Sequence, residues 1–104
     1  MIFTTTETIP GREISEIVGI VSGNVVQSKH IGRDIMAGLK SIVGGEIRGY
    51  TEMLNDARDT AISRMVSSAQ EKNADAIISI RFTTSAIMDG SSEILVFGTA
   101  VKLD

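Results

Sequence analysis

A long helical pattern between residues 46 and 72 limits the possible folds of this 104-residue chain more than any other feature. The apolar side chains of this run recur at about 100° per residue and form one stripe, which consists of Tyr50, Met53, Leu54, Ala57, Ala61, Met65 and Ala69. A helix with one apolar face has to bury that face against another layer. The pattern predicts a helix that begins at about Glu46 or Tyr50 and ends at Lys72, with Asn73 as a left-handed terminator.

Four segments with β-branched or alternating apolar residues predict strands around this helix. They cover residues 2–6, 16–27, 76–82 and 93–103. Pro10-Gly11 is a turn signal that closes the first strand. Asp89-Gly90 is typical of a hairpin turn and joins the last two strands.

A second, weaker helical pattern runs from about Ser28 to Val43 and ends at Gly44-Gly45. The predicted order is therefore strand, strand, helix, helix, strand, strand. This order favours an α+β fold in which an antiparallel sheet is packed against one long helix. We expect residues 1–104 to form a single domain.

The strand predicted at 16–27 carries apolar side chains on both faces, and Gly19 and Gly23 lie on one of these faces. A backbone without side chains at this point would admit a close neighbour, either a helix or another subunit. Because two helices can cover one face of the sheet, the other face needs a partner. The pattern therefore predicts that the chain contacts copies of itself in a homo-oligomer.

The composition argues against several functions. The chain has no cysteine and one histidine, which excludes a disulfide framework and a thiol nucleophile. A net charge of −3 does not fit a nucleic-acid-binding protein. We find no membrane span, signal segment, nucleophile elbow or phosphate-binding fingerprint. We therefore expect a cytoplasmic protein with no membrane partner, no catalytic residues and no cofactor-binding residues.

Two sets of residues on the long helix could bind metal ions. Glu52, Asp56 and Asp59 share one face and could hold a hard cation, but this face lies opposite the apolar stripe and is explained by contact with water. Met53 and Met65 could bind a soft ion, but they lie on the apolar stripe, where methionine usually fills gaps in the core.

The one histidine, His30, is followed one turn later by Asp34. The Asp34 carboxylate could orient the His30 imidazole for proton transfer. Alternatively, His30 could belong to the opening turn of a helix. A small hydrolase that uses His30 or Glu46 with Tyr50, near the glycine pair, is a further alternative. None of these residues lies in a motif that requires an enzyme.

Several polar residues lie beside the apolar stripe or at the ends of the predicted strands. Arg58 and Arg64 flank the stripe on opposite sides, and Asp75 and Arg81 lie near the start of the third strand. With Tyr50 they could form a polar network that binds helix to sheet or subunit to subunit. Alternatively, Arg58 or Arg64 could simply extend from the margin of the apolar stripe into water.

The order and spacing of several short motifs extend over nearly the whole chain. They are Thr4-Thr5-Thr6, Pro10-Gly11, Val18-Gly19-x-Val21-x-Gly23, Gly32-Arg33-Asp34, Gly44-Gly45-Glu46, Tyr50-Thr51, Ala57-Arg58, Arg64-Met65 and Asn73-Ala74-Asp75-Ala76. This arrangement resembles the YbjQ-like family of small bacterial and archaeal proteins, which carries a heavy-metal-binding label.

The resemblance implies an α+β subunit related in fold to dodecin-like subunits. It implies that the subunits assemble into a ring, usually a pentamer, and it implies no activity. The family label makes a metal ion the one cofactor to consider, with His30, Asp34 and Glu46 as candidate ligands. A ring allows several subunits to share such a site, because symmetry repeats one ligand around the axis.

Together these observations predict a non-enzymatic homo-oligomer that serves as an assembly or binding module. The alternative is a protein that binds a metal ion or small ligand at the interfaces between its subunits.

Overall fold

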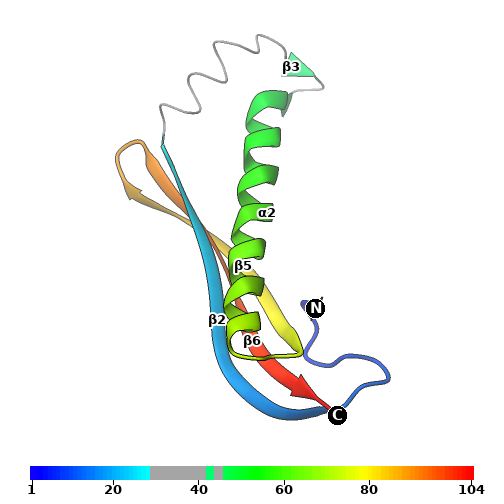
Figure 1. The fold of residues 1–104 in the computed structure, drawn as a ribbon. Helices are drawn as coiled ribbons and strands as arrows, with labels where there is room; N and C mark the ends of the chain where they lie inside the picture. The colour runs from blue at the N-terminus through cyan, green and yellow to red at the C-terminus, as the bar shows by residue number, and fades with distance from the viewer. Residues whose placement is uncertain (29–41, 44–45) are drawn as a thin grey trace.

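The structure is a computed structural model that describes residues 1–28, 42–43 and 46–104. These residues form one long helix and two sheets (Figure 1). The elements in chain order are β1 (Ile2–Phe3), β2 (Ile14–Ser28), β3 (Ile42–Val43), β4 (Glu46–Ile47), α2 (Arg48–Glu71), β5 (Ala76–Met88) and β6 (Ser91–Leu103).

The main sheet has four strands in the order β1-β5-β6-β2. β6 pairs antiparallel with β2 on one side and with β5 on the other. The predicted strands at 16–27, 76–82 and 93–103 are thus confirmed, and each is longer than expected at one end or both. The hairpin between β5 and β6 turns at Asp89-Gly90, as predicted.

The prediction of a wholly antiparallel sheet is wrong at β1. This strand covers only Ile2–Phe3 and pairs parallel with Ala76 and Ile77 of β5. Just beyond, the pairing between β5 and β6 shifts between Ile78 and Arg81. The amides that this bulge frees donate to the N-terminal segment, from Ser79 to the Thr6 carbonyl at 2.9 Å and from Ile80 to the Thr4 carbonyl at 3.1 Å. The sheet is therefore mixed, because β1 runs parallel to β5 while β6 is antiparallel to both β2 and β5.

The helix α2 runs alongside β2 and packs mostly on β2 and β6 (Figure 1). The predicted apolar stripe faces the sheet, and its C-terminal half is the best buried part, with Ala61, Met65 and Ala69 fully covered. These residues form the main core with residues of the three long strands, namely Val21, Ile77, Ile80, Val96 and Ala100. The N-terminal half of the stripe is only partly buried.

Gly23 allows the close approach of α2 to β2. A Cβ atom at this position would overlap the carbonyl oxygen of Ala61 and lie 2.6 Å from the amide nitrogen of Met65. The predicted neighbour of the bare strand face is therefore the chain's own helix. At Gly19 a Cβ would meet no atom within 4 Å, but φ is +150°, a conformation that strongly favours glycine. The two glycines thus have different roles.

The helix ends where the sequence predicts. Asn73 has φ of 60°, its amide donates to the Gln70 carbonyl at 3.0 Å, and the Ala74 amide donates to the Ala69 carbonyl at 3.1 Å. These two hydrogen bonds form a Schellman motif, which satisfies carbonyl groups of the last helical turn. The chain then enters β5 at Ala76.

The second predicted helix is wrong at its end. Ile42–Val43 form β3, which pairs antiparallel with β4. Both residues are β-branched, and such side chains favour strands because their χ1 freedom is restricted in a helix. The rest of this prediction, residues 29–41 and the Gly44-Gly45 stop, lies outside the described residues.

Candidate functional site

Arg64 joins the long helix to the outer strand of the sheet. Its Nη1 donates to the main-chain carbonyl oxygen of Asn24 at 2.6 Å. The Asn24 side chain in turn donates to Glu93 Oε2 of β6 at 2.9 Å. Arg64, predicted to bind helix to sheet or subunit to subunit, thus contacts the sheet of its own subunit.

The other predicted network residues make separate contacts. Arg81 Nη1 donates to the Thr5 carbonyl at 2.9 Å, which ties the N-terminal segment to β5. Asp75 Oδ2 accepts a hydrogen bond from the Leu103 amide at 2.9 Å, at the other end of the sheet.

Arg58 donates from Nη1 to Asn55 Oδ1 at 3.2 Å, a contact within the helix. The predicted network therefore does not form among the residues that the structure describes. No hydrogen bond or ion pair described there joins any two of Arg58, Arg64, Asp75 and Arg81. Within the described residues, each of the four side chains makes its hydrogen bonds to neighbours in the same subunit.

The structure leaves the predicted metal ligands without a described site. His30 and Asp34 lie outside the described residues, and Glu46 is described only by its backbone in β4. Within 1–28, 42–43 and 46–104, no group of three or more histidine, cysteine, aspartate or glutamate side chains could hold a metal ion. The carboxylates of Glu52, Asp56 and Asp59 are exposed, as the helical pattern predicts.

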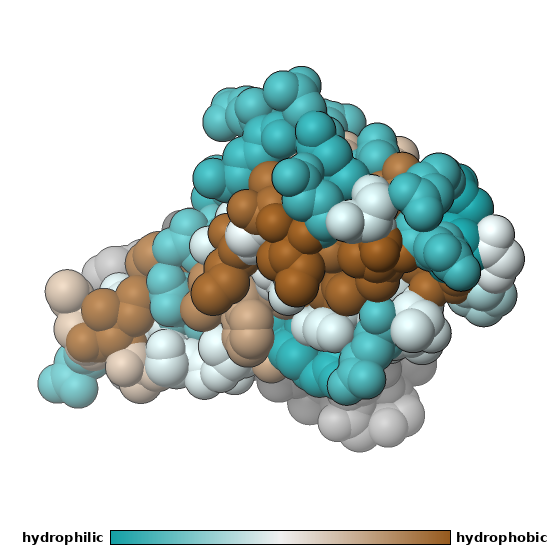
Figure 2. All heavy atoms as spheres, turned by 90° about the horizontal axis from the view of Figure 1, so that it is seen from below, coloured by the Kyte–Doolittle hydropathy of each residue, from teal (hydrophilic) through white to brown (hydrophobic). Residues whose placement is uncertain are grey.

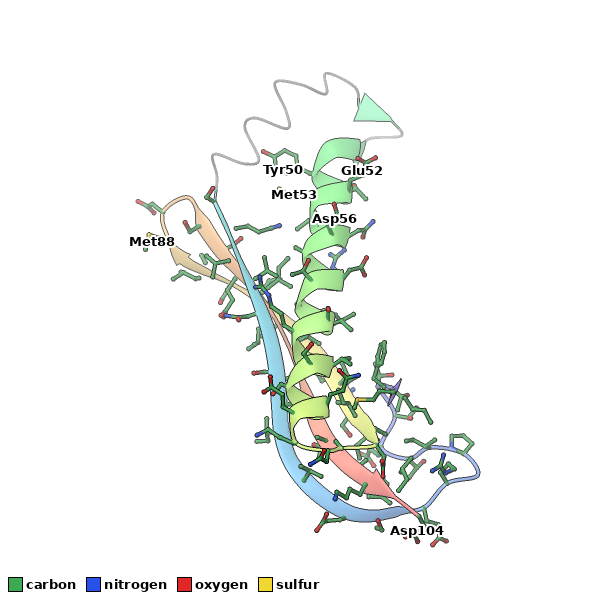
Figure 3. The ribbon with its side chains drawn as sticks, viewed as in Figure 1. Tyr50, Glu52, Met53, Asp56, Met88 and Asp104 are labelled. Carbon is green, nitrogen blue, oxygen red and sulfur yellow. The ribbon has the colours of Figure 1, made fainter. Side chains whose placement is uncertain are left out.

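A cavity of about 390 Å³ lies between the N-terminal half of α2 and the tip of the β5–β6 hairpin. Tyr50 and Met53 line it from the helix, and Met88 and Asp89 line it from the hairpin. Figure 3 shows Tyr50 and Met53 on the helix and Met88 across from them on the hairpin. Gln27 lines the cavity from β2, and its Nε2 donates a hydrogen bond to the Met53 carbonyl at 3.5 Å. The lining of the cavity therefore includes two methionines, a tyrosine and an aspartate.

Sequence reasoning missed this cavity. It assigned Met53 to the apolar stripe, and Met88 belonged to no pattern. The two methionines are 35 positions apart, and only the tertiary arrangement of the hairpin and the helix makes them line one cavity. No local signal in the sequence could have paired them.

A second cavity, of about 370 Å³, lies between α2 and the outer strand β2. Glu52 and Asp56 line it together with Met53, and Val25 and Gln27 form its β2 side. No lysine or arginine lines it, so its polar side is acidic. Met53 and Gln27 line both cavities.

Large apolar side chains remain exposed on both sides of the sheet. Ile17 and Ile20 of β2 are 72% and 81% exposed. Phe3 and Phe82 are about half exposed and line an apolar groove of about 250 Å³, with Ile62 of α2 on its other wall. Figure 2 shows hydrophobic residues gathered in a band across one face of the molecule, between hydrophilic margins.

One helix laid on a four-stranded mixed sheet, with apolar side chains left exposed, defines a small α+β protein. A crystal structure with this fold is similar over 100% of this chain and 98% of the other chain, with a TM-score of 0.67 and 18% identity. It is that of a Pediococcus pentosaceus protein with unknown function, which belongs to the DUF74 family. At this identity the likeness concerns the fold alone.

The YbjQ_1 family model, described as "Putative heavy-metal-binding", matches residues 1–104. A UPF0145 protein of Shewanella frigidimarina is 84% identical over 99% of this chain and 96% of its own length. A UPF0145 protein of the archaeon Archaeoglobus fulgidus is 58% identical over 99% of this chain and 95% of its own length. The chain belongs to the YbjQ family, also named UPF0145, which has bacterial and archaeal members.

The helix α2 has too few apolar residues to cross a bilayer. No helix in the part of the chain that the structure describes meets the length and hydropathy needed for a membrane span.

Proposed function

We propose that the protein is a non-enzymatic assembly module, a subunit that works as part of a homo-oligomeric ring. The observation that carries this proposal is the large surface that one subunit leaves uncovered. The chain exposes 6720 Å², whereas a compact monomer of 11.1 kDa exposes about 5,700 Å². The excess is about 1,000 Å², close to the ~800 Å² that each partner buries in a stable interface.

The shape of the subunit supports the same proposal. The radius of gyration is 16.7 Å, whereas about 13 Å is typical of a compact domain of this length. An elongated monomer has too little interior to cover both faces of its sheet. Consistent with this, Ile17 and Ile20 are exposed on β2, and Phe82 is exposed on β5.

The exposed residues favour contacts between copies of the same chain. Large exposed apolar patches mark surfaces that bind partners. Here the patches lie on several elements of one small subunit, so a ring in which every subunit uses two different surfaces would cover them. The family resemblance implies five subunits in such a ring.

Light scattering coupled to size exclusion tests this proposal directly. We expect one species of several times 11.1 kDa at micromolar concentration. A stable monomer of 11.1 kDa under these conditions would overturn the proposal.

A second candidate function is the binding of a soft metal ion or small ligand in the cavity between α2 and the hairpin. The observation that favours it is the convergence of Met53 and Met88 with Tyr50 and Asp89 around one cavity. Thioethers are ligands for soft ions such as Cu(I), and the description of the family model agrees with this class of ligand. Titration with Ag(I), a soft stand-in for Cu(I), tests it, and no binding above that of a Met53→Leu, Met88→Leu double variant would overturn it.

A further inference from the structure

The apolar groove between the N-terminal segment, β5 and α2 has an arginine at its margin. The volume of the groove is about 250 Å³, and the residues that line it are Phe3, Thr4, Thr5, Ile62, Ile80 and Phe82. None of these six residues carries a charge, so the lining favours an apolar group. A closed apolar cavity of about 150 Å³ holds one benzene molecule, so this groove has room for an aromatic ring with a short chain.

Arg81 is held beside the groove by two of the residues that line it. Its Nη1 donates to the Thr5 carbonyl at 2.9 Å and to the Ile80 carbonyl at 2.7 Å. These bonds use both hydrogens of Nη1 and leave the three N–H groups on Nη2 and Nε. Within residues 1–28, 42–43 and 46–104, no acceptor and no ion pair is described for these three groups. The guanidinium therefore offers a positive charge and unused donors at the margin of an uncharged groove.

The wall of the groove beside Arg81 is fixed by hydrogen bonds within the subunit. The Ile80 amide donates to the Thr4 carbonyl at 3.1 Å, and the Ser79 amide donates to the Thr6 carbonyl at 2.9 Å. Ser79 has φ of 54°, a left-handed conformation at the bulge of β5. Bulges re-aim the side chains that follow them and are frequent beside binding sites. A wall formed in advance lowers the entropy that a ligand loses on binding.

We propose that this groove binds a small aromatic carboxylate, with its ring on the apolar lining and its carboxylate on Arg81. Phe3 and Phe82 are 48% and 45% exposed, so both phenyl rings have surface left to pack against another ring. A carboxylate carries the one negative charge that a single guanidinium balances, and its two oxygens can accept two parallel N–H bonds. The proposal is separate from the proposed assembly and from metal binding, since neither requires a ligand in this groove.

Titration of the whole chain with 3-phenylpropionate, followed by NMR of selectively labelled isoleucine methyl groups, tests the location of the site. We expect the methyl signals of Ile62 and Ile80, which line the groove, to shift as the ligand is added. Ile20 lies on β2, at the other side of the sheet, and its signal should stay in place. The same titration yields the affinity.

The neutral alcohol 3-phenylpropanol tests the role of the charge, because it keeps the ring and lacks the carboxylate. It should bind at least about tenfold more weakly than 3-phenylpropionate, since it loses a charge-assisted hydrogen bond. Arg81→Gln should weaken 3-phenylpropionate by a similar factor and leave the affinity for the alcohol unchanged. Arg12→Gln is the matched control and should change neither affinity, because Arg12 is exposed and donates from Nη2 to the Asp104 carbonyl at 3.4 Å.

Each other outcome overturns the proposal in a different way. Unshifted Ile62 and Ile80 signals at millimolar ligand exclude the site, and light scattering of the same sample shows separately whether the proposed assembly stands. Equal affinities for the acid and the alcohol exclude recognition of a carboxylate by Arg81. An equal loss of both affinities in Arg81→Gln would show that Arg81 only supports the wall of the groove. If that variant does not fold, the comparison of acid and alcohol on the unmodified chain still decides.

Discussion

Arg64 Nη1 lies 2.6 Å from the carbonyl oxygen of Asn24, so a side chain of α2 binds the backbone of the outer strand. In the same region Gly23 brings the helix backbone against this strand. Together the two residues hold α2 over one face of β2. Ile20 of the same strand pairs with Thr99, on the face away from the helix, and is 81% exposed.

Replacement of Arg64 by methionine should lower the free energy of unfolding by about 1 kcal/mol, because the Asn24 carbonyl loses a charged donor while the apolar stem is kept. Urea denaturation measures this change. Arg58→Met is the matched control, since the hydrogen bond described for Arg58 is to Asn55 of its own helix. Equal effects of the two substitutions would show that the Arg64 contact adds no stability.

Gly23→Ala should lower the free energy of unfolding by at least about 2 kcal/mol, because the new methyl group overlaps the backbone of α2 at Ala61 and Met65. Thermal unfolding followed by circular dichroism measures the loss. Ser22→Ala, at the neighbouring exposed position, should change the melting temperature little. A Gly23→Ala variant as stable as the wild type would contradict the close packing described here.

Asn73→Ala should cost about 1 kcal/mol, because alanine tolerates the left-handed conformation at φ of 60° poorly. Asn73→Gly should be at least as stable as the wild type, since glycine adopts this conformation without a steric penalty. Chemical denaturation of the two variants provides the comparison. Equal losses in both would mean that the side chain of Asn73, and not its backbone conformation, stabilises the helix end.

Ile20→Asp should shift the oligomer towards smaller species, because it places a charge at a position that is 81% exposed in one subunit and that we expect to be covered in the assembly. Sedimentation velocity over a range of concentrations measures the shift. Ser63→Asp adds the same charge on the exposed side of α2 and should leave the assembly intact. If Ile20→Asp assembles as tightly as the wild type, Ile20 lies outside the interface.

Met53→Leu and Met88→Leu should each weaken Ag(I) binding at least about tenfold if the cavity holds a soft ion, because each substitution removes one thioether at nearly constant volume. Competition with a chromogenic silver or copper chelator measures the affinity. Met65→Leu removes a thioether from the core and should not change it. Unchanged affinity in both cavity variants would exclude this site.

Local patterns predicted much of the fold. The long helix, its end at Asn73 and the hairpin at Asp89-Gly90 depend on backbone preferences and on contacts between near neighbours, which the order of residues contains. The parallel β1 could not be read this way. It depends on pairing between Ile2 and Ala76, which lie far apart in the sequence.

The candidate sites were less accessible to sequence reasoning than the fold. The polar residues were found as individuals, but their partners were not, because Arg64 and Asn24 are 40 positions apart and Arg81 and Thr5 are 76 apart. The cavity lined by Met53 and Met88 was not expected at all. These contacts and the cavity depend on how segments far apart in the sequence are arranged in space, and no local sequence pattern encodes that arrangement.

The sequence by itself determined that the chain forms a long amphipathic helix among strands with apolar side chains on both faces. It could do so because secondary structure follows from the spacing of apolar residues along the chain. Only the tertiary structure decided that the helix lies over β2 and β6, that Gly23 meets the helix while Gly19 does not, and that Arg64 of the helix binds the Asn24 carbonyl of β2. These features depend on close packing between distant segments, where a single Cβ atom or a one-residue bulge decides which surfaces meet.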